Sequence, residues 1–231
     1  MIKKILFVCE GTTELYLLYK ILKKNDKVKV NEEIEENGNI KMSNLKLEKY
    51  IFSNEDIEIF AYNLEGVSNL KKFIENISKI RIFSELCKIL FIFDADYSKS
   101  ENETGYEQRK TSIEYHKESL VEGNKKLEIE YFITPNNKDD GMTEDLIINS
   151  LKCTEIVKYM KRVIKEVKEM KEAEIKNESK SLFMMVAATQ NPLKGTAPVF
   201  LSGCYDKIDK GCADFQKIVK FIEKEVDIEN R

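Results

Sequence analysis

The sequence has little cysteine and almost no histidine, with five cysteines and one histidine in 231 residues. The cysteines are odd in number, scattered, and form no CxxC pair, which excludes a disulfide framework and a zinc site. Their positions are Cys9, Cys87, Cys153, Cys204 and Cys212. This usage fits a reducing compartment, so we expect a cytoplasmic protein.

Long hydrophobic runs are also missing, because no stretch approaches the roughly 20 apolar residues that span a bilayer. The opening apolar run follows two lysines, but it ends at Glu10 and has no small-residue cleavage site. Residues 2–9 are therefore interpreted as a first strand and not as a signal peptide. We expect no attachment to a membrane.

Neither sign of charge is in large excess, since 38 Lys and Arg stand against 41 Asp and Glu, for a formal net charge of −3. This balance excludes a global attraction to phosphate polymers, although a local basic patch remains compatible with it. The sequence G-x-x-x-x-G-K-[ST] does not occur, which excludes a P-loop enzyme.

The apolar residues alternate between strand-like runs and helix-like periodicity, which predicts an α/β fold with a mostly parallel sheet flanked by helices. The expected strands cover residues 2–9, 57–64, 88–93 and 127–134. Helices are expected after caps at Thr12 or Thr13, at Ser68 and at Thr104. Residues 25–55 are polar and are interpreted as an excursion outside the core.

From Thr143 onward the pattern is almost wholly helical. The chain contains no internal repeat, no low-complexity linker and no proline-rich hinge. We therefore predict a single unit over residues 1–231, with an α/β core over 1–150 and a helical C-terminal extension over 151–231 packed on it.

Acidic residues stand where the predicted strands end, and open α/β sheets bind ligands at that edge. Glu10 ends the first strand, and Asp94 and Asp96 end the central one. Alternation along an extended segment predicts that the two aspartates point to the same side and reach one ion. The alternatives are a solvated strand end for the aspartates and an interaction with the helix dipole for Glu10.

Glu144 and Asp145 follow the fourth predicted strand and begin the next helix. They are either a further source of carboxylates for the same site or an acidic first turn that interacts with the helix dipole. Hard oxygen ligands of this kind select Mg²⁺, Mn²⁺ or Ca²⁺ over zinc.

Two motifs together resemble the Toprim family, a strand that ends in Glu-Gly and a later strand that ends in Asp-x-Asp. The matching segments are Val8-Cys9-Glu10-Gly11-Thr12-Thr13-Glu14 and Phe91-Ile92-Phe93-Asp94-Ala95-Asp96. The resemblance implies that Glu10 is a general acid or base and that Asp94 and Asp96 hold Mg²⁺. It also implies that Glu14 is a further acidic metal-site position and that Gly11 allows close approach of the backbone.

Segments 132–137 and 141–146 also look like those of a small family of Toprim-related bacterial proteins, similar to the Toprim domain of the overcoming-lysogenization-defect nucleases. The chain lacks the nucleophilic-tyrosine domain of topoisomerases and the zinc module of primases. DNA strand passage is therefore not expected.

The resemblance leads to two expectations for function. The first is a Mg²⁺- or Mn²⁺-dependent phosphoryl-transfer enzyme, a nuclease that contacts DNA or RNA through the metal site. Local bases would then attract the phosphates, and the candidates are Lys99, Arg109, Lys110 and Lys138. The second is a non-catalytic or regulatory Toprim relative, associated with defence, whose helical extension binds a protein partner.

Overall fold

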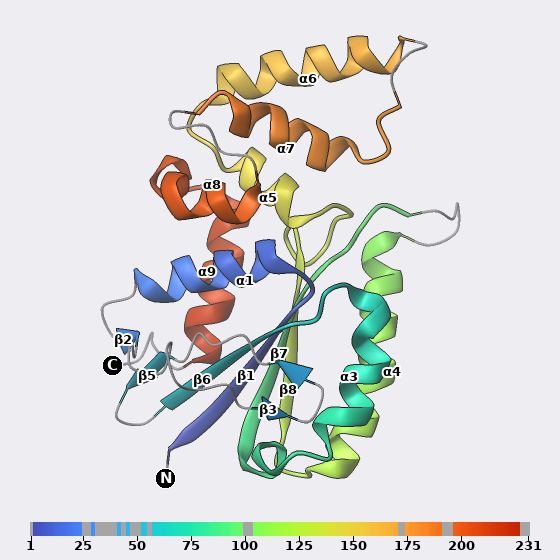
Figure 1. Ribbon diagram of the computed structural model, residues 1–231, viewed down its shortest axis with the longest axis vertical. Coiled ribbons are helices and arrows are strands. Elements are labelled where there is room, and N and C mark those ends of the chain that lie inside the picture. Colours follow the sequence, from blue (N-terminus) through green and yellow to red (C-terminus); the bar gives the residue numbers. More distant parts are fainter. Residues whose placement is uncertain are drawn as a thin grey trace.

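Four parallel strands form the centre of the computed structural model (Figure 1). In spatial order they are β6 (Ile57–Asn63), β1 (Lys3–Cys9), β7 (Leu86–Asp94) and β8 (Glu128–Thr134). The structure describes residues 2–24, 29–30, 41–42, 45–46, 52–54, 57–98, 104–170, 174–190 and 196–226. The four strands nearly coincide with the predicted ones, and the α/β class with a mostly parallel sheet is confirmed.

Short strands continue the sheet beyond β6. β5 (Phe52–Asn54) pairs antiparallel with β6, and β2 (Lys29–Val30) pairs antiparallel with β5. A separate antiparallel pair is formed by β3 (Lys41–Met42) and β4 (Leu45–Lys46). The predicted excursion over residues 25–55 therefore contributes two edge strands to the main sheet and the separate β3–β4 pair, and its other residues lie outside the described residues.

Successive residues of β1 face opposite sides of the sheet, as the two-residue period of a strand requires. Ile5, Phe7 and Cys9 pack against α1 (Thr12–Lys23) and the C-terminal helices, whereas Leu6 and Val8 pack on the other face. That second face is covered by α3 (Leu70–Ile77) and α4 (Gly105–Gly123); the 3₁₀ helix η1 (Val67–Asn69) precedes α3, and η2 (Arg81–Glu85) precedes β7. The sheet is therefore buried on both sides, which explains its continuous apolar runs.

The C-terminal part of the chain is helical, as predicted, and belongs to the same core as β1 and α1 (Thr12–Lys23). Its elements are α5 (Thr143–Asn149), α6 (Thr154–Lys168), α7 (Glu178–Ala188), α8 (Ala197–Cys204), η3 (Tyr205–Lys207) and α9 (Ala213–Glu225). α9 buries Phe215, Ile218 and Ile222 completely. α6 and α7 lie beyond the carboxyl edge of the sheet (Figure 1). Within the described residues, no helix is long and apolar enough to cross a membrane.

The N-terminal caps of the helices differ in part from those predicted from the sequence. Thr104 caps α4 as predicted, since its Oγ1 accepts a hydrogen bond from Glu107 N at 3.1 Å. The cap of α1 is Gly11 and not Thr12 or Thr13, because the Glu14 carboxylate reaches back to Gly11 N at 2.8 Å. Ser68 lies inside η1 and does not cap α3. A glutamate in the first turn of α1 thus satisfies the N–H of the capping residue itself.

Candidate functional site

The carboxyl ends of β1 and β7 lie side by side and bring Glu10 next to Asp94. Cys9 is in register with Ile92, and the backbone continues this contact with Glu10 N donating to Ile92 O at 3.0 Å. The Glu10 side chain turns toward the neighbouring strand, where its Oε2 accepts a hydrogen bond from Asp94 N at 3.2 Å. The predicted neighbourhood of the two strand ends is therefore present in the fold.

Arg109 of α4 connects Glu10 with Asp96. Its Nη2 lies 2.8 Å from Asp96 Oδ2 and 3.6 Å from Glu10 Oε2, and its Nε donates to Asp94 O at 2.7 Å. The close approach of α4 requires glycine at position 105, where a Cβ atom would lie 2.6 Å from Asp96 O. Arg109 is only 8% exposed, so its charge is committed to this site.

The structure shows no contact between the other bases proposed for phosphate attraction and the predicted acids. Lys110 is partly exposed and lies 4.0 Å from Glu107, and Lys138 is exposed. Lys99 lies outside the described residues. Arg109 is thus the one member of the predicted set that the structure places among the predicted acids.

The Asp94 carboxylate points to a second group of residues. Its Oδ1 accepts hydrogen bonds from Thr134 Oγ1 at 2.7 Å, Thr143 N at 2.8 Å and Thr143 Oγ1 at 2.9 Å. The strand alternation from which we predicted that Asp94 and Asp96 point to the same side ends before Asp96, which has a φ of 61°. The two aspartates consequently contact different partners.

Glu14 and Glu144 are buried near Asp94, at 3% and 6% exposure. Glu144 Oε1 accepts a hydrogen bond from Thr13 Oγ1 at 3.3 Å, whereas Oε2 is buried and has no partner among the described residues. Asp145 is separate from this cluster. Its Oδ2 accepts hydrogen bonds from Met142 N at 2.8 Å and from the Tyr97 hydroxyl at 2.9 Å.

Burial raises the pKa values of four of these carboxyl groups. The pKa of Glu10 rises to about 7, where burial outweighs the opposing charge of Arg109 and the nearby Asp94 and Asp96 add to the increase. Burial, followed by the charge of Asp94, also raises the pKa values of Glu14 and Glu144. Burial raises the pKa of Asp94 itself. The site therefore concentrates more negative charge than Arg109 alone offsets.

These residues have the donor chemistry of a site for a hard divalent cation. All available ligands are carboxylate or hydroxyl oxygens, and the unpaired Glu144 Oε2 is a buried acceptor without a donor. Within the described residues, however, no three His, Cys, Asp or Glu side chains already form a coordinating group. Asp96 instead forms an ion pair with Arg109 at 2.8 Å.

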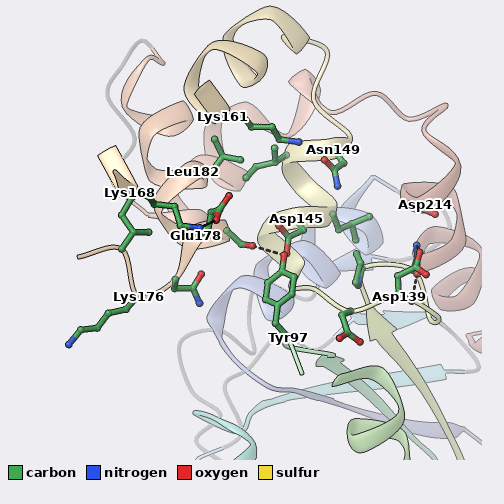
Figure 2. Close-up of a pocket in the computed structure, with 18 residues that line it drawn as sticks. Tyr97, Asp139, Asp145, Asn149, Lys161, Lys168, Lys176, Glu178, Leu182 and Asp214 are labelled. Carbon is green, nitrogen blue, oxygen red and sulfur yellow. Dashed lines mark hydrogen bonds and ion pairs between the residues drawn. The ribbon is translucent and has the colours of Figure 1, made fainter. Parts of the chain in front are cut away.

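Two cavities adjoin the site and share Tyr97. The smaller measures about 220 Å³ and is lined by Ala95, Asp96, Tyr97, Gly105, Gln108, Arg109 and Ser112. The larger measures about 800 Å³ and lies between the loop after β8, α5 and the pair α6–α7 (Figure 2). A volume of this size is typical of small-molecule and substrate sites.

Sequence reasoning missed Thr134 and Thr143 as partners of Asp94. Thr134 stands opposite Asp94 in the register of β7 and β8, and Thr143 is the first residue of α5. Their position at the end of a predicted strand and the start of a predicted helix was the available signal. Gly11 N donates to Glu14, and the close backbone approach that Gly11 would allow stays a prediction.

Comparison with known proteins gives a family and a fold. The model of the family described as "Protein of unknown function (DUF3226)" matches residues 3–226. The crystal structure of hypothetical protein PH0156 from Pyrococcus horikoshii OT3 aligns with a TM-score of 0.60 at 13% sequence identity, covering 98% of this chain and 96% of that chain. At this identity the similarity shows a shared fold alone. No curated protein gives a significant match.

Proposed function

The chain belongs to the DUF3226 family, and we propose that it is a Mg²⁺- or Mn²⁺-dependent phosphoryl-transfer enzyme that cleaves DNA or RNA. One observation supports this proposal above the others. Four carboxyl groups with raised pKa values gather at the carboxyl edge of the sheet, and one of their oxygens is buried without a partner. Buried negative charge of this kind is unfavourable without a cation.

Asp94, Asp96 and Glu14 are the residues that would hold the ion, and Glu144 would supply a further carboxylate. When bound, the ion would neutralise charge on a phosphate and lower the pKa of a coordinated water molecule. Thr134 and Thr143 keep the Asp94 carboxylate oriented through hydrogen bonds at 2.7–2.9 Å. Binding at Asp96 would compete with its ion pair to Arg109.

Glu10 is the proposed general acid or base. A carboxyl group with a pKa of about 7 exchanges protons at neutral pH, whereas an ordinary glutamate is almost fully ionised there. Its contact with Asp94 N places it at the strand end, beside the residues proposed to hold the metal.

Arg109 is the proposed phosphate-binding residue, because it lines the small cavity together with Asp96. A guanidinium group donates hydrogen bonds in a planar fork that matches phosphate oxygens. Its contacts with Asp96 and Glu10 hold that fork in place before a substrate arrives. The proposed relationship to Toprim nucleases rests on the order Glu10-Gly11 and Asp94-x-Asp96 and remains a prediction.

A regulatory, non-catalytic module is the second candidate, and the ion pair of Arg109 with Asp96 and Glu10 favours it. In such a protein Arg109 would replace the metal as the permanent counter-ion. The two candidates differ in their response to Mg²⁺ and Mn²⁺, since only the enzyme requires these ions for its reaction.

The proposal is tested by incubating the protein with single- and double-stranded DNA and RNA in the presence of Mg²⁺, Mn²⁺ or a chelator. We expect cleavage of at least one nucleic acid that disappears with the chelator. The double variant Asp94→Asn/Asp96→Asn should be inactive. Cleavage that is unchanged in the double variant would contradict the site assignment, and the absence of cleavage in every wild-type reaction would favour the regulatory candidate.

A further inference from the structure

Among the described residues, one lysine that lines the larger cavity has no partner. Lys161 of α6 lines it and forms no ion pair or hydrogen bond within the described part of the chain, and Figure 2 shows its side chain pointing into the cavity. The other lysines of the lining are engaged: Lys168 lies 2.5 Å from Glu178, and Lys176 lies 3.9 Å from Glu174. Lys161 is exposed to solvent at this lining, so its charge is accessible to an anion.

The carboxylates of the same cavity are already hydrogen-bonded to the protein. Asp140 accepts a hydrogen bond from Tyr106 N at 2.9 Å, and Asp139 accepts one from Asn136 Nδ2 at 2.8 Å. Asp214 pairs with Lys217 at 2.8 Å. These contacts fix the three carboxylates in the cavity walls, and Lys161 is the lysine of the lining that has no such contact within the described residues.

Tyr97 supplies a fixed aromatic side chain that lines both cavities. Its hydroxyl is held by Asp145 Oδ2 and by Ser179 Oγ, each at 2.9 Å, while 52% of the residue remains exposed. A ring that is anchored through its hydroxyl and open on its side is a stacking platform for a nucleobase. Leu146 and Leu182 add apolar surface to the same cavity.

We propose that this cavity binds a nucleotide of a single-stranded nucleic acid whose neighbouring phosphate contacts Arg109 in the small cavity. The base stacks on Tyr97, and the next phosphate contacts Lys161. Tyr97 lines both cavities, so the proposed strand runs past its ring from one cavity to the other. This inference rests on the proposed function and adds that the nucleic-acid substrate is single-stranded.

The test is the affinity of a fluorescein-labelled oligodeoxyadenylate, measured by fluorescence anisotropy in Mg²⁺ with Glu10→Gln as the cleavage-deficient background. Adding Lys161→Glu should weaken binding about tenfold or more, since hydrogen bonds to charged groups contribute strongly to binding. The matched control is Lys165→Glu, because Lys165 is exposed on the same helix and does not line the cavity. Equal affinities for the two variants would overturn the inference.

Two further readouts separate direct contact from a structural effect. Lys161→Ala should reduce the slope of log affinity against log salt by about 0.7, the value for one phosphate contact on a single strand, whereas Lys165→Ala should leave it unchanged. Tyr97→Ala should weaken binding about tenfold, while Tyr97→Phe should retain most of the affinity because it keeps the ring. An unchanged salt slope for Lys161→Ala would contradict a phosphate contact.

Adenosine monophosphate distinguishes a strand from a free nucleotide. If it binds in a Lys161-dependent manner and the oligonucleotide does not, the cavity is a free-nucleotide site and the strand inference is wrong. Absence of oligonucleotide binding to the background protein would overturn it as well. Lys161-dependent binding without cleavage by the wild type would instead support the cavity and contradict the proposed enzyme.

Discussion

Replacing Glu10 by glutamine should stabilise the folded protein at alkaline pH while removing the proposed proton-transfer group. The carboxyl group is partly enclosed at the end of β1, and its pKa rises from 4.5 to about 7. Each unit of pKa corresponds to about 1.4 kcal/mol, so keeping Glu10 ionised inside the folded protein costs about 3 kcal/mol at pH 8.

The sign of the pH dependence follows from the same shift. Because the folded protein has the higher pKa, it binds more protons than the unfolded chain between about pH 4.5 and pH 7. The contribution of Glu10 therefore makes the free energy of unfolding fall as pH rises through this window. An amide does not ionise, but it also loses the attraction to Arg109, so we expect a net gain of about 1–3 kcal/mol at pH 8 and a smaller gain at pH 5.

Urea unfolding of wild type and Glu10→Gln at pH 5 and pH 8, with a chelator present, measures this difference. Glu118→Gln is the matched control, because Glu118 is an exposed glutamate of α4 for which no change is expected. If Glu10→Gln is no more stable than wild type at pH 8, the carboxylate is not destabilised by burial. The assignment of Glu10 as a group that titrates near neutrality would then fail.

Three other outcomes are expected. Mg²⁺ at about 100 times its dissociation constant should raise the melting temperature by about 5–10 °C, and by more at pH 8 than at pH 5. The double variant Asp94→Asn/Asp96→Asn should abolish this shift, and an undiminished shift would show that the ion binds elsewhere. Arg109→Gln should raise the pKa of Glu10, because the Arg109 charge lowers it, and should shift the acid limb of the pH–rate profile to higher pH. An unshifted limb would show that Glu10 is not the group that titrates there. Thr143→Val should cost about 1–3 kcal/mol in urea unfolding by removing a hydroxyl donor from buried Asp94, and a neutral result would show that Thr134 alone suffices.

The positions of Glu10 and Asp94 were predictable because each follows a strand that the apolar pattern marks clearly. Parallel pairing of β1 with β7 then brings the two strand ends together. Asp96 was assigned to the right loop, but its orientation was not predictable, since a positive φ and a bridge to Gly141 end the strand geometry there. Local alternation rules do not apply beyond such a residue.

The remaining contacts of the site depend on non-local packing. Arg109 lies thirteen residues after Asp96 in sequence, and it reaches the acids because α4 approaches the strand end closely at Gly105. Thr143 reaches Asp94 only because the chain returns from β8 into α5 beside the same strand end. Neither contact has a spacing rule in the sequence, and the cavity that α5, α6 and α7 enclose has none either.

The central claim is that Glu10 moves a proton during metal-dependent cleavage of a phosphodiester. Its most direct test is the cleavage rate of a labelled single-stranded oligonucleotide in Mg²⁺ or Mn²⁺, compared between wild type and Glu10→Gln. We expect metal-dependent cleavage by the wild type and a loss of about 10²–10⁴ in rate for the variant, the usual contribution of general acid–base catalysis. Cleavage by Glu10→Gln at the wild-type rate would contradict the account.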